Sequence, residues 1–105
     1  MATTTFIHVT QCDNDLRIKA LPTSGLGSME ILHITSGAGN PVEYRVNLKS
    51  VLPTGPYNLV LEGTNWGGPS GFTVIITTGG VDTPHIFGAG LPAGGVASQV
   101  IAITV

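Results

Sequence analysis

Residues 42–49, VEYRVNLK, alternate apolar and polar side chains without a break. Successive side chains of a β-strand point to opposite faces, so this alternation places all of the segment's apolar side chains on one face. In an α-helix the same side chains would be scattered around the axis. Leu16, Ile18 and Ala20 alternate with Arg17 and Lys19 in the same way. Both segments therefore predict strands with one buried and one solvated face.

Three other segments are apolar on both faces and rich in β-branched or aromatic residues: 57–61 (YNLVL), 72–76 (FTVII) and 100–105 (VIAITV). Such runs of strand length predict strands buried inside a sandwich or against another subunit. Further strands are expected at 5–10, 29–35 and 83–87. The last predicted strand runs to Val105, which predicts that this end is paired in a sheet or at a subunit contact, since an open edge would risk aggregation.

Glycine and proline fall mostly between these runs, as turn chemistry does. Seven or eight short strands at intervals of about ten residues are typical of an antiparallel β-sandwich, with a small β-barrel as the alternative. A chain of 105 residues suits one domain, spanning residues 1–105. No capped helical stripe is present, so no helix is expected. The stretch 88–95 (GAGLPAGG) is predicted to be the most flexible.

Only 10% of the residues are charged, against about 25% in ordinary soluble domains. This low charge indicates either a surface buried in an oligomer or a neutral surface of hydroxyl and amide groups. Four basic residues and a net charge of −2 argue against nucleic-acid binding and against a polybasic lipid patch. No apolar run is long enough for a membrane span. No signal peptide is recognisable, which leaves a cytoplasmic location, export without a cleaved leader, or a leader already removed.

The three histidines, His8, His33 and His85, lie in separate predicted strands without any metal-ligand spacing. They are interpreted as ordinary strand positions, and no metal or cofactor is predicted. The single cysteine, Cys12, excludes an intramolecular disulfide. It opens the segment 12–15 (CDND), which resembles the start of a calcium loop but suits a hairpin turn better. The two neighbouring carboxylates are expected to raise the pKa of the Cys12 thiol.

Catalytic motifs are also missing. The sequence contains no nucleophile elbow, no P-loop and no dinucleotide fingerprint, and Ser70 within 68–71 (GPSG) does not match the elbow. A Glu62 and Asp82 pair would suit acid–base work, but nothing in the sequence brings them together. The chain is therefore predicted not to be an enzyme.

Trp66, the only tryptophan, stands in the glycine-rich stretch 63–71 (GTNWGGPSG). An indole offers a flat apolar face with an N–H on its edge, which is the combination that stacks under a sugar. Glycines would let a ligand approach the backbone. The predicted ligand-binding residues are Trp66, Asn65, Glu62, Asn58 and Ser70. The equally physical alternative is that Trp66 is a plug folded over an open end of the sandwich.

These observations favour a non-enzymatic, lectin-like module that binds a glycan and forms a homo-oligomer. The alternative is a structural or self-assembling protein, in which Trp66 and the C-terminal strand lie in the core or in a subunit interface.

Overall fold

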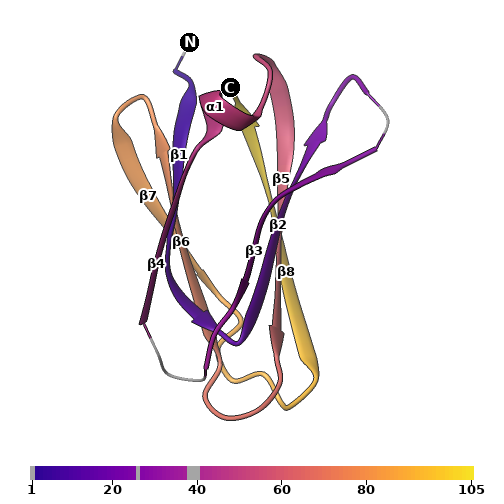
Figure 1. The fold of residues 1–105 in the computed structure, drawn as a ribbon, viewed down its shortest axis with the longest axis vertical. Helices are drawn as coiled ribbons and strands as arrows, with labels where there is room; N and C mark the ends of the chain where they lie inside the picture. Colours follow the sequence, from indigo (N-terminus) through magenta and orange to yellow (C-terminus); the bar gives the residue numbers. More distant parts are fainter. Residues whose placement is uncertain (1, 26, 38–40) are drawn as a thin grey trace.

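The computed structural model describes residues 2–25, 27–37 and 41–105, which form two four-stranded antiparallel sheets packed together (Figure 1). Sheet A has the strand order β4-β1-β6-β7 and sheet B the order β3-β2-β5-β8. Along the chain the elements are β1 (Thr4–Asp13), β2 (Asp15–Pro22), β3 (Met29–Thr35), β4 (Pro41–Asn47), α1 (Leu48–Val51), β5 (Pro56–Asn65), β6 (Gly71–Thr78), β7 (Val81–Phe87) and β8 (Gly95–Thr104). The predicted β-sandwich is confirmed with eight strands, and the barrel alternative is wrong because both sheets are open.

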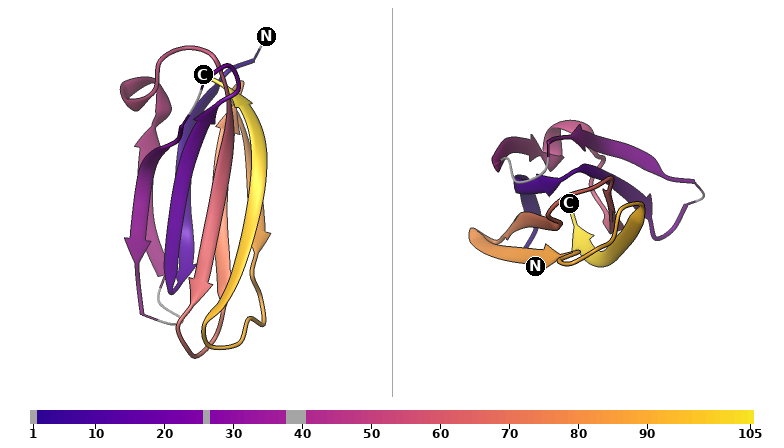
Figure 2. Two further views of the ribbon diagram at one scale, coloured as in Figure 1. Left: turned by 90° about the vertical axis from the view of Figure 1, so that its right-hand side faces the viewer. Right: turned by 90° about the horizontal axis from the view of Figure 1, so that it is seen from below.

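The two sheets form a flat, elongated body of 40 × 29 × 18 Å (Figure 2). Both chain ends and α1 lie at one end of this body (Figure 1). The loops 66–70 and 88–94, which follow β5 and β7, lie at the other end. The Trp66 segment and the chain termini are therefore at opposite ends of the sandwich.

The core lies between the sheets and follows the period-two pattern. Leu16, Ile18 and Ala20 are fully buried, as their alternation predicted. Each run that is apolar on both faces buries only one of its two faces within the chain. Val100 is 65% exposed while Ile103, on the opposite face of β8, is buried. A sandwich of two layers covers only the inner face of each sheet, so these outer apolar side chains stay open to solvent.

The CDND segment is not a hairpin turn, so that prediction is wrong. β1 ends at Asp13 in sheet A and β2 begins at Asp15 in sheet B, so the chain crosses between sheets at Asn14. Backbone hydrogen bonds hold this crossing: Asn14 N donates to Thr64 O at 3.0 Å, and Asn14 O accepts from Ser36 N at 2.7 Å. An asparagine suits the position because its side chain adds a third bond, in which Asn14 Oδ1 accepts from Trp66 N at 2.7 Å.

One short helix interrupts the strands, which the sequence did not predict. The alternating segment stops being a strand at Asn47, whose side chain caps α1 by accepting from Lys49 N at 3.1 Å. Leu48, expected on the strand's apolar face, is instead buried from the first turn of α1. Within the described residues, no helix has the length and apolar character that crossing a membrane requires.

The C-terminal strand is longer than expected, because β8 begins at Gly95. Beyond it, Val105 is buried and exchanges two backbone hydrogen bonds of 2.8 Å with Gly55. The expectation that this end is paired is confirmed within the chain itself.

Gly63 is packed closely against the core, because a Cβ there would lie 2.6 Å from Cε2 of the fully buried Phe72. The Phe72 ring is itself stacked on Phe87 at 5.3 Å. We expect Gly63→Ala to lower the free energy of unfolding by about 1–3 kcal/mol, since the ring must move within a packed core. Urea unfolding measures this change.

Gly71→Ala is the matched control, because a Cβ there meets Gln11 Nε2, the end of a flexible side chain, at 3.0 Å. Its unfolding midpoint should stay closer to that of the unchanged protein. Equal losses in the two variants would contradict the steric explanation.

Candidate functional site

Trp66 is exposed rather than buried. Along β5 the side chains alternate, with Leu61, Gly63 and Asn65 facing the core and the residues between them facing out. Trp66 directly follows Asn65, the last residue of β5, and is 65% exposed. The core-plug alternative is therefore wrong, because a plug over the end of the sandwich would bury the indole.

Hydrogen bonds from the N–H groups of Trp66 and of the residue that follows it fix the backbone that carries the indole. Trp66 N donates to Asn14 Oδ1 at 2.7 Å, which ties it to the crossing between the sheets. Gly67 N donates to Asn65 Oδ1 at 3.1 Å. The indole is therefore presented from a braced corner, and little backbone freedom would be lost when a ligand binds.

Asn65, predicted to meet a ligand hydroxyl, has a structural role instead. It is 1% exposed, and its amide nitrogen donates to Gly68 O at 3.2 Å and to Leu91 O at 2.7 Å. Together with the bond from Gly67 N, these contacts occupy both donors and one acceptor position of the amide. Asn65 thus ties the 66–70 loop to the 88–94 loop, so the stretch predicted to be most flexible is held at its centre.

Ser70 is hydrogen-bonded to the backbone, and Asn58 is far from Trp66. The Ser70 hydroxyl lies at the Trp66 end but donates to Gly88 O. Asn58 lies on β5 eight residues before Trp66, which is about 26 Å along an extended strand. The structure therefore does not bring Asn58 to the indole.

Glu62 lies on the outer face of β5, four residues before Trp66. It forms an ion pair with Lys19 Nζ at 3.0 Å. Asp82 is on the outer face of sheet A, where its carboxylate accepts from Thr77 Oγ1 at 2.6 Å. The two carboxylates are therefore on opposite sides of the sandwich and cannot act as a pair.

The strand register places other polar groups beside Thr64 and Glu62, the outward residues that precede Trp66. Thr64 is the outward residue between Glu62 and Trp66, and its cross-strand neighbours are Asp15 on β2 and Val96 on β8. Ser98 is the neighbour of Glu62 on β8. We call the following residues the Trp66 site: Trp66, Thr64, Glu62, Asp15 and Ser98.

Sequence reasoning missed three members of this site. Thr64 could have been found, because residues 62, 64 and 66 share one face of any strand. Asp15 and Ser98 could not, since their positions depend on the pairing of β2 and β8 with β5.

The histidines do not gather. His8 bonds to Glu43 at 2.5 Å on sheet A, His33 bonds to Asp15 at 2.6 Å on sheet B, and His85 lies on β7. Across residues 2–25, 27–37 and 41–105, no three metal-ligating side chains lie together.

Cys12 is fully buried beneath Ile34, whose carbonyl accepts from its thiol at 3.7 Å. Burial raises the pKa of Cys12 to about 12, with smaller contributions from Asp15 and Asp13. The predicted direction of the pKa shift is confirmed, but its main cause is desolvation rather than the neighbouring carboxylates.

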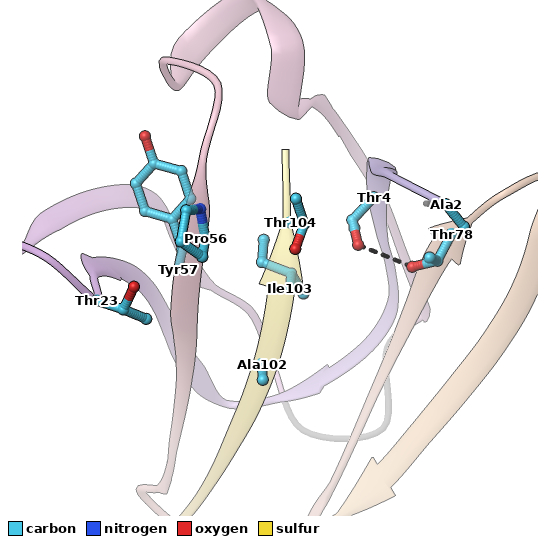
Figure 3. Close-up of a pocket in the computed structure, with 9 residues that line it drawn as sticks. All are labelled: Ala2, Thr4, Thr23, Pro56, Tyr57, Thr78, Ala102, Ile103 and Thr104. Atoms are coloured by element: carbon cyan, nitrogen blue, oxygen red, sulfur yellow. Dashed lines mark hydrogen bonds between the residues drawn. The ribbon is translucent and has the colours of Figure 1, made fainter.

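A pocket of about 320 Å³ opens at the other end of the sandwich (Figure 3). Thr4 and Thr78 border it on one side, joined by a hydrogen bond of 2.8 Å, and Tyr57 lies on the other. No charged side chain lines it. Every buried side-chain nitrogen and oxygen in the described part of the chain has a partner, so no orphaned group points into this pocket.

We expect Asn65→Ala to lower the free energy of unfolding by about 1–3 kcal/mol, because removing the amide leaves polar groups of two loops without their hydrogen-bond partner. Proteolysis within 88–94 should also become faster. Asn58→Ala on the same strand is the control, with an expected change within about 0.5 kcal/mol. Unfolding curves and limited proteolysis test both variants; a neutral Asn65→Ala would contradict the bracing role.

A second expectation concerns pH. The unfolded chain releases the Cys12 proton near pH 9 while the folded chain holds it up to about pH 12. The thiol's contribution to stability is thus fully present below pH 9 and is lost as the pH rises toward 12. The gap in unfolding free energy between the unchanged protein and Cys12→Ala should therefore narrow over this window, and a constant gap would contradict it.

Comparisons with protein-family models, with curated proteins and with solved structures found no match for this chain. Its function is therefore inferred from the geometry of the Trp66 site.

Proposed function

We propose that this chain is a non-enzymatic carbohydrate-binding module that holds a neutral glycan against the Trp66 site. The observation that carries the proposal is the exposed indole, 65% accessible on a braced backbone. Tryptophan is highly buried on average, so an exposed indole leaves a large apolar surface in water. A ligand that stacks on this surface would remove it from water.

The groups around the indole suit a polyhydroxylated ligand. The indole face accommodates the C–H face of a sugar ring. The Thr64 hydroxyl both donates and accepts, and the carboxylates of Asp15 and Glu62 accept from sugar hydroxyls. Thr64 is about 7 Å from Trp66 along the strand and Glu62 about 13 Å. A single ring stacked on Trp66 would therefore reach Thr64, and an oligosaccharide would extend to Glu62 and Ser98.

The charged groups of the site favour a neutral ligand. Glu62 is paired with Lys19, and Asp15 is hydrogen-bonded to His33. The two carboxylates would repel a sulfated or an acidic ligand, because like charges brought together at an interface oppose binding. A neutral oligosaccharide therefore fits this surface better.

The chemistry of the other candidates supports a binding role over catalysis. Glu62 and Asp82 lie on opposite sides of the sandwich. The Cys12 thiol is buried and its pKa is raised, which is the opposite of an activated nucleophile. The Ser70 hydroxyl is engaged with a backbone carbonyl and has no base beside it in the described contacts.

Self-association is the second candidate, as a homo-oligomer in which exposed apolar side chains are covered. The observation that favours it is separate from the indole: β8 is an open edge of sheet B. If Trp66 anchored the subunit contact, Trp66→Ala would change the molecular mass rather than sugar binding.

A fluorescence titration tests the carbohydrate proposal, since Trp66 is the only tryptophan. The free protein should show a red emission that soluble quenchers reduce, because the indole is exposed. A neutral oligosaccharide that binds should shift the emission to the blue and protect it from quenching. By calorimetry, Trp66→Ala should abolish binding, and Trp66→Phe should weaken it about tenfold, which is about 1.4 kcal/mol.

Thr104→Val is the control, because Thr104 lines the pocket at the other end of the sandwich. It should bind the same oligosaccharide unchanged. Binding that survives Trp66→Ala and is lost in Thr104→Val would move the site to that pocket. An emission that no oligosaccharide in a broad neutral panel alters would overturn the proposal.

A further inference from the structure

Each sheet of the sandwich has two edges, which makes four edge strands: β4 and β7 in sheet A, and β3 and β8 in sheet B. An edge strand presents unpaired N–H and C=O groups, so another chain can pair with it unless charges, prolines or bulges interfere. The four edge strands differ in whether they carry features that prevent pairing with another chain.

Three of the edges carry such features. β7 has Asp82 and Pro84 within it. β4 begins at Pro41 and carries a glutamate and an arginine. β3 contains Glu30, and its pairing with β2 shifts register beside Lys19. These three strands are poor templates for pairing.

β8 has none of these features. Its ten residues, GVASQVIAIT, include no charge and no proline, and its register with β5 runs without a shift. Its outward side chains are small or apolar, and Val96 and Val100 are both largely exposed. The longest of the four edge strands is therefore also the least protected.

The hydrogen-bond pattern shows which groups of β8 are free. Val105 and Gly55 exchange two backbone hydrogen bonds, so Val105 faces β5. In an antiparallel ladder successive residues alternate between facing the partner and facing away. The N–H and C=O groups of residues 96, 98, 100 and 102 therefore point to the open edge. The same four residues place their side chains on the outer face of sheet B.

We propose that β8 pairs antiparallel with β8 of a second copy of this chain, joining the two B sheets into one continuous eight-stranded sheet. An antiparallel strand pair is self-complementary about a two-fold axis, so identical edges fit each other. The absence of charge on β8 means that no like charges meet there. Among the strands of residues 2–25, 27–37 and 41–105, only β8 is an unprotected edge, so the assembly closes as a dimer rather than growing into a fibre.

The pairing has a consequence for recognition, and this consequence alone depends on the proposed function. A two-fold axis perpendicular to the joined sheet keeps both outer faces on the same side. Trp66 follows Asn65, which is opposite Gly95 at the start of β8, so the two indoles would lie toward opposite ends of one face. A dimer would thus engage two glycans on one surface, and the second contact would be intramolecular.

The test is the mass in solution, measured by light scattering after gel filtration over a series of concentrations. The unchanged protein should give a mass twice 10.8 kDa, falling on dilution. Val100→Pro should give a folded monomer, because it removes an N–H that points to the open edge and none that bonds β5. Val100→Lys is a second variant, in which like charges would meet near the axis.

Ile86→Lys is the matched control, since Ile86 is a 69% exposed apolar residue on the protected edge strand β7. It should remain a dimer, and circular dichroism should match across all variants. The proposal is overturned by a protein that is monomeric at every concentration, by a dimer that survives both Val100 variants, or by assemblies larger than a dimer. The two proposals are tested separately. Sugar binding by a monomeric Val100→Pro variant would support the carbohydrate proposal, whereas the molecular mass alone tests the pairing of β8.

Discussion

A two-layer sandwich can bury only one face of each strand, and most features of this molecule follow from that constraint. Inward residues such as Leu16, Leu59 and Phe72 fill the space between the sheets. Whatever lies at the alternate positions must face water, whether it is charged, as Glu62 is, or apolar, as Val100 is. Trp66, which follows the inward Asn65 at the end of β5, is exposed as well.

Two asparagines connect this layered core to the end of the sandwich that carries Trp66. Asn14 lies where the chain passes from sheet A to sheet B, and its side chain also holds the backbone of Trp66. Asn65 uses its amide to join the two loops at the same end. Both are polar groups in buried surroundings with their bonds satisfied, which is the condition under which such groups add order to a fold. The backbone position of the exposed indole is fixed because the buried amides of Asn14 and Asn65 are themselves held by hydrogen bonds.

Much of the architecture could be predicted from the sequence, since strand period and turn chemistry are local. The inward set on β2 and the all-β class follow directly from the alternation of Leu16, Ile18 and Ala20. The crossing at Asn14 could not be predicted, because a hairpin and a passage between sheets use the same turn residues. The four residues of α1 could not either, since Leu48 fits the strand pattern until Asn47 caps a helix.

The sequence indicated only in part which residues of the proposed site are open to solvent. Trp66 is exposed and Glu62 lies on the outer face of β5, but Asn65 is buried, which could not be predicted because its partners across the loop, such as Leu91, are distant in sequence. Asp15 lies beside Thr64, and Ser98 beside Glu62, only because β2 and β8 pair with β5 in this register. The sequence supplies the period of a strand, whereas the partners of a side chain depend on tertiary pairing.

The division between inner and outer faces also bears on how such a chain can change over generations. Thr64, Glu62 and Ser98 face outward, so none of them fills the space between the sheets, while the residues between them hold the core. Substitutions at the outward positions can therefore accumulate at little cost to folding. Under the proposed function, residues that contact the ligand alternate along each strand with residues that form the core, so ligand contacts can change while the scaffold stays the same.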